Sequence, residues 1–341
     1  MTAYLGGYTS SDGGGDGIAL ADLSAGVART VCEVPDPSFL ALSGDGRFLY
    51  ACHELEAGEV GAYAVADEGG LTPLGRRSTG GAHPCHLAVH PRGEFLLSAN
   101  YTSGSVAVHP IGPDGALGEA VQVVQHSGSG PDADRQDGPH AHMVACDPVE
   151  EFVFAVDLGT DSVYVYAFDA ASGQLTERSR LVLPPGAGPR HIAFQPDWLT
   201  AYVITELSST LVVCDWNPET AELTALQTVS TRSDGATGPN QPAEVLVSGD
   251  GRTVYGSNRG DDTIAVFTTY DEGRRVELVQ TIPTGGSWPR HLALSADEST
   301  IYATNERSDS VTSFVISPAD GTLTPAGGPL SWPKPVCIVP V

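Results

Sequence analysis

Short apolar runs of about five residues alternate with tight polar turns along the whole chain. One copy of this pattern begins at Pro189, continues through the run 190–195 and a turn, and resumes at Tyr202 in a second run that ends at Glu206. Runs rich in β-branched and aromatic residues, bounded by Gly, Pro and Asp, are typical of β-strands. The pattern therefore predicts a hairpin of two strands in each copy.

The predicted hairpin recurs at a regular interval. Units open at prolines 37, 84, 139, 189, 242 and 289, which lie about 47 to 55 residues apart. The third strand of a unit is clearest in segments 105–108, 162–166, 211–214, 263–267 and 311–314. Repeats of this length, each with four short strands, are typical of β-propeller blades. The chain is therefore predicted to be an all-β protein.

The two ends of the chain complete one further unit between them. Residues 3–8 match a second strand, segments 17–23 and 29–34 match the third and fourth, and residues 333–339 match a first strand. Six whole units and one shared unit predict a seven-bladed β-propeller of four-stranded blades. Pairing of the C-terminal first strand with the N-terminal strands would close the ring and remove exposed edges. We expect residues 1–341 to form a single propeller, with 333–341 and 1–36 in the closing blade.

Composition narrows the possible partners and the compartment. The net charge of -25 argues against nucleic acid and anionic membrane surfaces, which require clustered Lys and Arg. Neither a signal-peptide pattern nor a run of about 18 apolar residues is present, so we expect a cytoplasmic protein. We expect it to be a monomer or a dimer. The six cysteines are scattered without CxxC pairing, which favours reduced, buried side chains over a disulfide framework.

Hairpin geometry predicts where a site must lie. The first strands line the central channel and tight turns join them to the second strands, so first-strand starts and second-strand ends meet at one mouth. The first-strand column contains Ser38, Cys85, His142, Arg190, Ala243, Arg290 and Lys334. The second-strand column contains Tyr8, Glu54, Tyr101, Leu158, Glu206, Arg259 and Glu306, and the residues just before it include Asn100, Asp157 and Asn305. Two long loops open on this mouth, 125–139 with Arg135 and Gln136, and 230–241.

Arginines give the strongest chemical signal at this mouth. Arg190, Arg259 and Arg290 fall on one rim although the chain has only 17 Lys and Arg. A guanidinium group can hold a carboxylate or phosphate and can neutralise an oxyanion, but it can also form ion pairs between blades. Glu206 is expected near Arg190 of its own hairpin, either as an acid, base or orienting group or as a simple salt-bridge partner.

Histidines fall into two groups. His140 and His142 lie two residues apart, so both project to one side of an extended chain. A neutral imidazole there suits a general base, and the alternative is a pair that caps strand ends. The other group, His86, His191 and His291, recurs at one repeat position and is expected to form hydrogen bonds between blades. No HxxxH pattern or Cys/His cluster is present, so neither a metal nor a cofactor is expected.

Several of these segments resemble the seven-bladed propeller lactonase family, which includes bacterial propeller-type 6-phosphogluconolactonases and fungal carboxy-cis,cis-muconate lactonising enzymes. The resemblance covers essentially the full length and rests on the segments 138–142 (GPHAH), 157–159 (DLG), 188–191 (GPRH), 205–207 (TEL), 257–260 (SNRG) and 289–291 (PRH). In that family a His, two Arg and a Glu form the proposed site. The resemblance implies that His142, Arg190, Arg259 and Glu206 are the corresponding residues here.

Three functions fit these expectations. The leading hypothesis is hydrolysis of a sugar lactone, with 6-phosphogluconolactone of the pentose phosphate route as substrate. His142 would activate water, and Arg190 and Arg259 would hold the anionic group and the oxyanion. Glu206 would orient the cationic side chains or shuttle a proton. Further contacts to this small anionic substrate are expected from His140, Arg290, Asn100, Asp157, Asn305, Arg135 and Gln136. A muconate-type lactonising cycloisomerase would use the same arginines on carboxylates. A non-catalytic propeller would bind a small anionic ligand or a peptide at the mouth.

Overall fold

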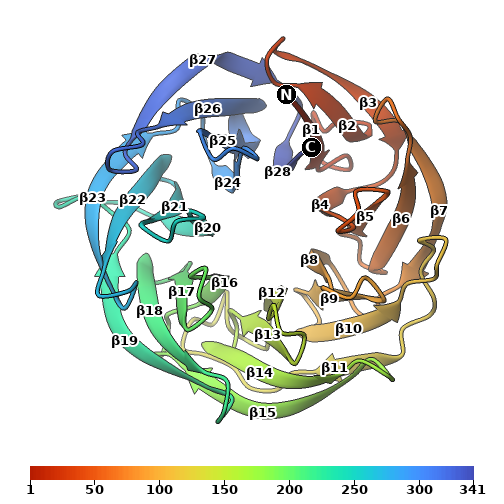
Figure 1. The fold of residues 1–341 in the computed structure, drawn as a ribbon, viewed down its shortest axis with the longest axis horizontal. Helices are drawn as coiled ribbons and strands as arrows, with labels where there is room; N and C mark the ends of the chain where they lie inside the picture. The colour runs from red at the N-terminus through yellow and green to blue at the C-terminus, as the bar shows by residue number, and fades with distance from the viewer.

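A computed structural model describes all residues of the chain, 1–341, as seven four-stranded antiparallel sheets arranged in a ring (Figure 1). From the channel outward, the first four blades are β28 (Pro335–Pro340), β1 (Thr2–Gly7), β2 (Gly17–Asp22), β3 (Val27–Glu33); β4 (Pro37–Leu42), β5 (Phe48–His53), β6 (Glu59–Val65), β7 (Leu71–Ser78); β8 (Pro84–Val89), β9 (Phe95–Asn100), β10 (Ser105–Pro110), β11 (Gln122–Gln125); and β12 (Ala141–Cys146), β13 (Phe152–Asp157), β14 (Ser162–Asp169), β15 (Gln174–Val182). The last three blades are β16 (Pro189–Phe194), β17 (Thr200–Thr205), β18 (Thr210–Asn217), β19 (Glu222–Ser230); β20 (Gln241–Val247), β21 (Thr253–Arg259), β22 (Thr263–Tyr270), β23 (Arg275–Pro283); and β24 (Pro289–Leu294), β25 (Thr300–Asn305), β26 (Ser310–Ile316), β27 (Leu323–Ser331). The predicted seven-bladed propeller is confirmed.

Helix is almost absent from the chain. The only helical element is a 3-10 turn, η1 (Glu306–Ser308), which follows β25 at the mouth of the channel. No helical segment has the length and apolar character needed to cross a lipid bilayer.

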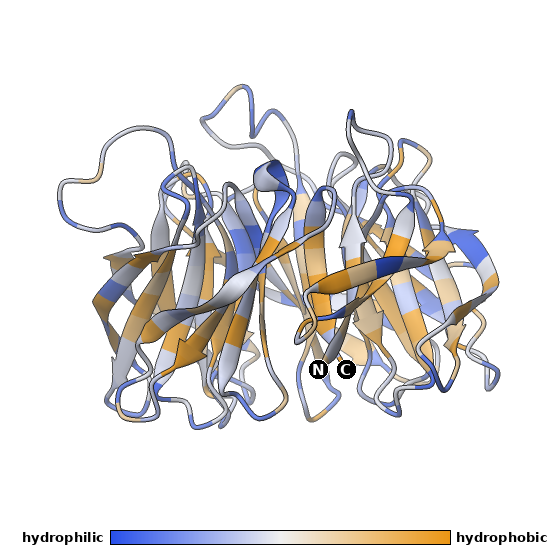
Figure 2. Ribbon diagram, turned by 90° about the horizontal axis from the view of Figure 1, so that it is seen from above, coloured by the Kyte–Doolittle hydropathy of each residue, from blue (hydrophilic) through white to orange (hydrophobic).

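Burial along the strands follows their depth in the blade. Second strands such as β13 and β17 are buried at every position, because neighbouring blades cover both of their faces. Outermost strands such as β15 and β19 instead alternate between buried and exposed positions, with one face in water. Figure 2 shows the apolar positions along the strands and the polar loops at both ends of the disc.

The ring closes between the two ends of the chain, as predicted. β28 pairs antiparallel with β1, with Leu5 opposite Ile338 and Tyr4 opposite Val339. Cys337 and Ile338 are buried in this blade. Because β28 starts at the mouth, the two termini lie at the other end of the disc, where the N–H of Val341 donates to the carbonyl of Thr2, and Figure 2 shows both termini on that side.

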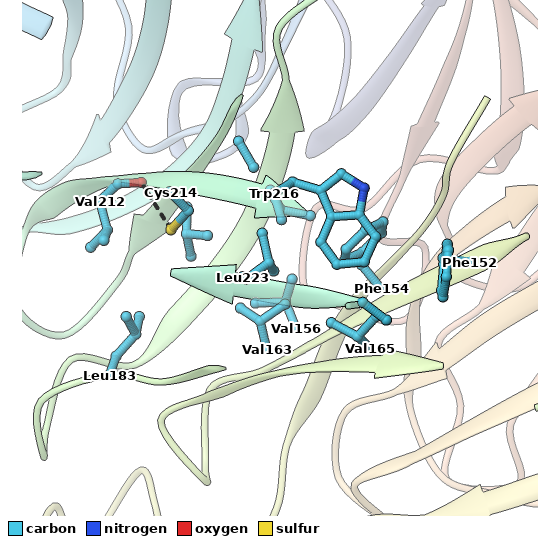
Figure 3. Packing of buried hydrophobic residues seen from close by; sticks show 14 of the residues in the cluster. Phe152, Phe154, Val156, Val163, Val165, Leu183, Val212, Cys214, Trp216 and Leu223 are labelled. Carbon is cyan, nitrogen blue, oxygen red and sulfur yellow. Dashed lines mark hydrogen bonds between the residues drawn. The ribbon is translucent and has the colours of Figure 1, made fainter. Parts of the chain in front are cut away.

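Apolar side chains fill each space between adjacent blades. Figure 3 shows the largest such cluster, in which Trp216 of β18 packs edge-on against Phe152 and Phe154 of β13, at centroid distances of 5.2 and 4.8 Å. In the same cluster the thiol of Cys214 faces the carbonyl of Val212 at 3.9 Å. Close packing of this kind fixes the blades relative to one another, and with them the ends of the strands at the mouth.

A β-bulge at the start of each first strand turns one side chain toward the mouth. In β16, Pro189 pairs with Thr205 and the next pair is His191 with Ile204, so Arg190 is the extra residue. The same shift occurs in the other six blades. Bulges re-aim side chains in this way and often lie beside functional sites. In the closing blade Val336 holds this position, which corrects the assignment of Lys334: Lys334 precedes β28 because Pro335 pairs with Gly7.

Candidate active site

A cavity of about 370 Å³ opens at the mouth of the channel, and all seven blades contribute to its lining. The lining residues are Tyr8, Glu54, Cys85, Tyr101, Arg135, His142, Glu206, Gln241, Arg259, Trp288, Arg290, Glu306 and Arg307. A narrower space below it, toward the channel, is lined by side chains that include Arg190, His191 and Arg290. The structure therefore brings together His142, Arg190, Glu206, Arg259, Arg290 and Arg135 from the set predicted by sequence.

Glu206 is the carboxylate on which three arginines converge. Its Oε1 accepts a hydrogen bond from Nη2 of Arg135 at 2.5 Å, and its Oε2 accepts one from Nη2 of Arg259 at 2.5 Å. Nε of Arg190 lies 3.4 Å from the same Oε2. Burial raises the pKa of Glu206, but the guanidinium groups of Arg259, Arg135 and Arg190 outweigh it and lower the pKa to about 2. Glu206 is thus ionised at neutral pH.

Arg190 is held from below by the neighbouring blade. Its Nη1 donates to the carbonyl of Ala243 at 2.7 Å and lies 3.2 Å from Nε2 of His191. Nδ1 of His191 is in turn 2.9 Å from Oε1 of Glu244. Burial, together with repulsion from Arg259 and Arg290, lowers the pKa of Arg190 to about 9. Its Nε is buried and has no hydrogen-bond partner within the protein.

His142 presents a neutral imidazole to the cavity. The side chain is buried, its ring lies edge-on to Tyr101 and His191, and its Nδ1 is 3.8 Å from Sγ of Cys85. Burial and the positive charge of Arg190 hold the pKa of His142 well below its usual value. Because no protein group bonds its Nε2, that atom can accept a proton from a molecule in the cavity.

An acidic group faces this cluster across the channel. The hydroxyl of Tyr8 donates to the carboxylate of Glu54, at 3.1 and 3.2 Å from its two oxygens. The guanidinium group of Arg290 lies over the ring of Tyr8 and 3.8 Å from Oε2 of Glu306. Burial raises the pKa of Glu54, and the charge of Arg290 opposes that shift. The two sides of the cavity therefore differ in character, one cationic around Glu206 and one acidic around Glu54.

Five side chains predicted as substrate contacts do not line the cavity: His140, Asn100, Asp157, Asn305 and Gln136. Nδ2 of Asn100 donates to Ser105, and Nδ2 of Asn305 donates to Thr312. Asp157 bonds Nδ1 of His126 at 2.6 Å and accepts two backbone N–H groups. Successive side chains of a strand point to opposite faces, so a residue one position before the mouth column turns into the blade.

The remaining two of these side chains support the loop that carries Arg135. Gln136 donates to the carbonyl of Leu158 and to the carboxylate of Asp161. The ring of His140 stacks on Tyr101 at 4.6 Å, and its Nδ1 is 2.9 Å from the Tyr101 carbonyl. His140 therefore supports the cavity wall indirectly.

Repeated histidines near the channel link neighbouring blades, as predicted. Glu244 lies between two of them, with Oε1 at 2.9 Å from Nδ1 of His191 and Oε2 at 3.3 Å from Nε2 of His291. Nδ1 of His86 accepts the backbone N–H of Val144 at 3.5 Å. No group of three or more His, Cys, Asp or Glu side chains in the chain is arranged to hold a metal ion.

Trp288 and Arg307 line the cavity but were not predicted from the sequence. The guanidinium carbon of Arg307 lies 3.4 Å from the centroid of the Trp288 ring, and that of Arg259 lies 5.5 Å from it. Trp288 directly precedes a repeat-opening proline, Pro289. An aromatic residue at that position was the signal that could have identified it.

Comparisons with known proteins agree with this architecture. A family model described as "Lactonase, 7-bladed beta-propeller" matches residues 2–340. The 6-phosphogluconolactonase of Bacillus subtilis is 36% identical, over 99% of this chain and 98% of its own. Two solved structures, of a protein from Lactobacillus plantarum and of the periplasmic gluconolactonase of Pseudomonas aeruginosa, are 32% and 28% identical, with TM-scores of 0.92 and 0.90; each comparison covers 99% of this chain and 98% of the other.

Proposed function

The chain belongs to the seven-bladed β-propeller lactonase family, and on that premise we propose that it hydrolyses 6-phosphogluconolactone to 6-phosphogluconate. The observation that carries the proposal is the convergence of Arg135, Arg190 and Arg259 on Glu206, beside the neutral imidazole of His142. Ester hydrolysis requires a base for water and cations for the developing negative charge. The name of the Bacillus subtilis relative supports this choice of lactone.

His142 acts as the general base in the proposed reaction. Its Nε2 takes a proton from water as the water oxygen attacks the lactone carbonyl carbon, and the carbonyl electron pair moves onto oxygen. The C–O bond to the ring oxygen then breaks, and that oxygen takes the proton back from the imidazolium. The sum is one water added and one ring ester bond broken, which gives the open hydroxy acid.

Arg190 and Arg259 stabilise the oxyanion that forms between these two steps. Both side chains are buried, so their charges act where water screens them little. The unpartnered Nε–H of Arg190 supplies a donor that is not already used within the protein. Neither arginine has to reorganise when the charge develops, because backbone carbonyls and Glu206 fix both of them.

Glu206 orients these cations in the proposal and does not carry the proton. Its two oxygens already accept hydrogen bonds from Arg135 and Arg259, and its pKa of about 2 keeps the carboxylate charged, and so paired with these cations, at neutral pH. Arg135 also donates to the hydroxyl of Tyr101 at 3.2 Å, so it ties the loop 126–140 to the cavity wall.

Arg259→Ala tests the proposed function. Glu206 keeps Arg135 and Arg190 in this variant, so the fold should survive, and we expect kcat for the lactone to fall by about 10² to 10³. The matched control is Arg252→Ala, because Arg252 is 80% exposed and lies between β20 and β21 at the other end of the disc. Wild-type turnover in Arg259→Ala would contradict the role of Arg259. A wild-type protein that converts muconates but no lactone would overturn the function itself.

A further inference from the structure

Arg307 differs from the other arginines of the cavity in having no carboxylate partner. Of the four arginines in the lining, Arg135 and Arg259 pair with Glu206, and Arg290 lies near Glu306. Arg307 stands exposed at the rim, with its guanidinium carbon 3.4 Å from the centroid of the Trp288 ring. Stacking uses the face of the guanidinium plane and leaves its in-plane N–H donors free for a ligand.

Backbone hydrogen bonds hold this stacked pair in register. The N–H of Arg307 donates to the carbonyl of Ser287, and the N–H of Glu306 donates to the carbonyl of Trp288, both at 3.1 Å. The N–H of Trp288 donates to Oδ1 of Asp262 at 2.7 Å. The ring and the guanidinium group are therefore placed by the same turn that carries the cavity wall.

The backbone of Trp288 is a second, independent observation. Its φ of 66° lies in the left-handed region, which favours Gly, Asn and Asp and is rare for bulky side chains. The equivalent position before a first strand has positive φ at Asp36, His83, Gly188 and Lys334 as well, so five of the seven blades share this conformation. A tryptophan at such a position is best explained by a use for its ring, and the ring supports Arg307.

The charges around the cavity favour an anion with more than one negative charge. Its lining contains the four guanidinium groups and three carboxylates, Glu54, Glu206 and Glu306, and Arg190 adds a further positive charge below. A local excess of two positive charges thus stands in a chain whose net charge is -25. Such an excess draws an anionic ligand to the mouth against the field of the rest of the protein.

We propose that Arg307, stacked on Trp288, forms a subsite for the phosphoryl group of a phosphorylated sugar lactone. This inference rests on the proposed function and assigns different arginines to the two ends of the substrate. Arg190 and Arg259 act at the lactone carbonyl, deep in the cavity, and Arg307 binds the phosphate at the rim. A guanidinium group suits this task because its paired N–H donors match two phosphate oxygens. The subsite makes the enzyme selective for the phosphorylated over the unphosphorylated lactone.

The kinetic test compares 6-phosphogluconolactone with glucono-δ-lactone in four proteins. In Arg307→Ala, the ratio of kcat/KM for the phosphorylated lactone to that for the unphosphorylated one should fall about 10- to 100-fold, mainly through KM. Arg307→Lys should recover part of the ratio, because it keeps the charge but not the fork of donors. Arg252→Ala, which removes a guanidinium group at the other end of the disc, should match the wild type. An unchanged ratio in Arg307→Ala would overturn the subsite.

A binding measurement separates failure of the subsite from failure of the proposed function. Calorimetric titration with 6-phosphogluconate and with gluconate needs no turnover, so it applies even if the wild type hydrolyses neither lactone. A loss of 6-phosphogluconate affinity in Arg307→Ala, with gluconate binding affected much less, supports the subsite in either case. Equal 6-phosphogluconate affinity in the two proteins, or no binding to the wild type, overturns it. A loss confined to Arg232→Ala would instead place the phosphate in the adjoining cavity of about 490 Å³ beside the loop 231–240.

Discussion

Replacing Glu206 by glutamine tests whether one carboxylate holds three arginines in place. The substitution keeps the shape of the side chain and removes its charge. Its amide nitrogen would also turn a donor toward guanidinium groups, which can only donate. Arg135, Arg190 and Arg259 would then repel one another without compensation, so we expect a loss of stability in addition to a loss of activity.

Burial of the ion pairs sets the size of the effect. The side chain of Glu206 is 2% exposed, and those of Arg190 and Arg259 are 4% and 5% exposed. Removing one partner from a buried pair costs about 3 to 5 kcal/mol, whereas a largely exposed pair contributes about 1 kcal/mol or less. Glu206→Gln should therefore lower the free energy of unfolding at pH 7 by about 3 to 5 kcal/mol. The control Glu277→Gln, at a side chain 54% exposed, should change it by less than about 1 kcal/mol.

The loss should also depend on pH in a defined direction. The pKa of Glu206 is about 2 in the folded protein and 4.5 for an unperturbed glutamate. A carboxyl group whose pKa is lowered by folding stabilises the protein fully above the unfolded pKa, and this contribution disappears as the pH falls through the folded pKa. The difference in stability between the wild type and Glu206→Gln should thus be constant above about pH 5. Below that pH it should shrink by about 1.4 kcal/mol per pH unit.

Urea unfolding followed by tryptophan fluorescence at several pH values between about 3 and 7 measures this difference directly. Taking the difference between two proteins cancels the titration of the many exposed carboxylates, which both share. A Glu206→Gln variant as stable as Glu277→Gln at pH 7 would refute the ion-pair description. A difference that stays constant from pH 5 to pH 3 would refute the assignment of the lowered pKa to Glu206.

Three further predictions concern the proposed base, His142, and the closure of the ring. His142→Gln should lower kcat by about 10² to 10⁴, and wild-type turnover would exclude the imidazole as base. Because burial and Arg190 hold the pKa of His142 well below its usual value, wild-type kcat/KM should stay constant from about pH 8 to pH 6, and a fall centred near 6.5 would contradict that assignment. Deleting residues 334–341 removes β28 with Val336, Cys337 and Ile338, three buried side chains that contribute about 5 kcal/mol or more, so cooperative unfolding should be lost. A truncated chain with an unchanged Tm would refute the importance of ring closure.

The fold could be predicted because the sequence of each repeat is enough to indicate the hairpin that it forms. Two apolar runs separated by a tight turn define a hairpin without reference to the rest of the chain, and the spacing of Pro189 from its equivalents defines the blades. Register was harder to predict. Lys334 was aligned with Arg190, whereas the bulge in β28 gives that position to Val336. A bulge inserts a residue without changing the hydrophobic pattern, so the pattern alone cannot locate it.

The candidate site was predictable only as far as hairpin geometry determines it. Arg190 and Glu206 could be placed together because they lie at the two free ends of one hairpin. The link from Arg135 to Glu206 could not be predicted, because it depends on the path of a long loop that has no repeat equivalent. Trp288 and Arg307 meet through a stacking contact that depends on a left-handed turn, and this conformation leaves no periodic signal in the sequence.

Seven equivalent backbone positions give this fold a way to build one asymmetric site. The bulged position of the first strand is Arg190 in one blade and Ala243 in the next. The side chain of Ala243 is small, and its backbone carbonyl accepts a hydrogen bond from Nη1 of Arg190. Apolar clusters between the blades fix both strands, so a change at either position alters the chemistry of the mouth with little effect on the frame. It follows that relatives with this ring can differ in substrate through single residues of the mouth columns, and that similarity of fold alone identifies the reaction less well than the residues on this rim.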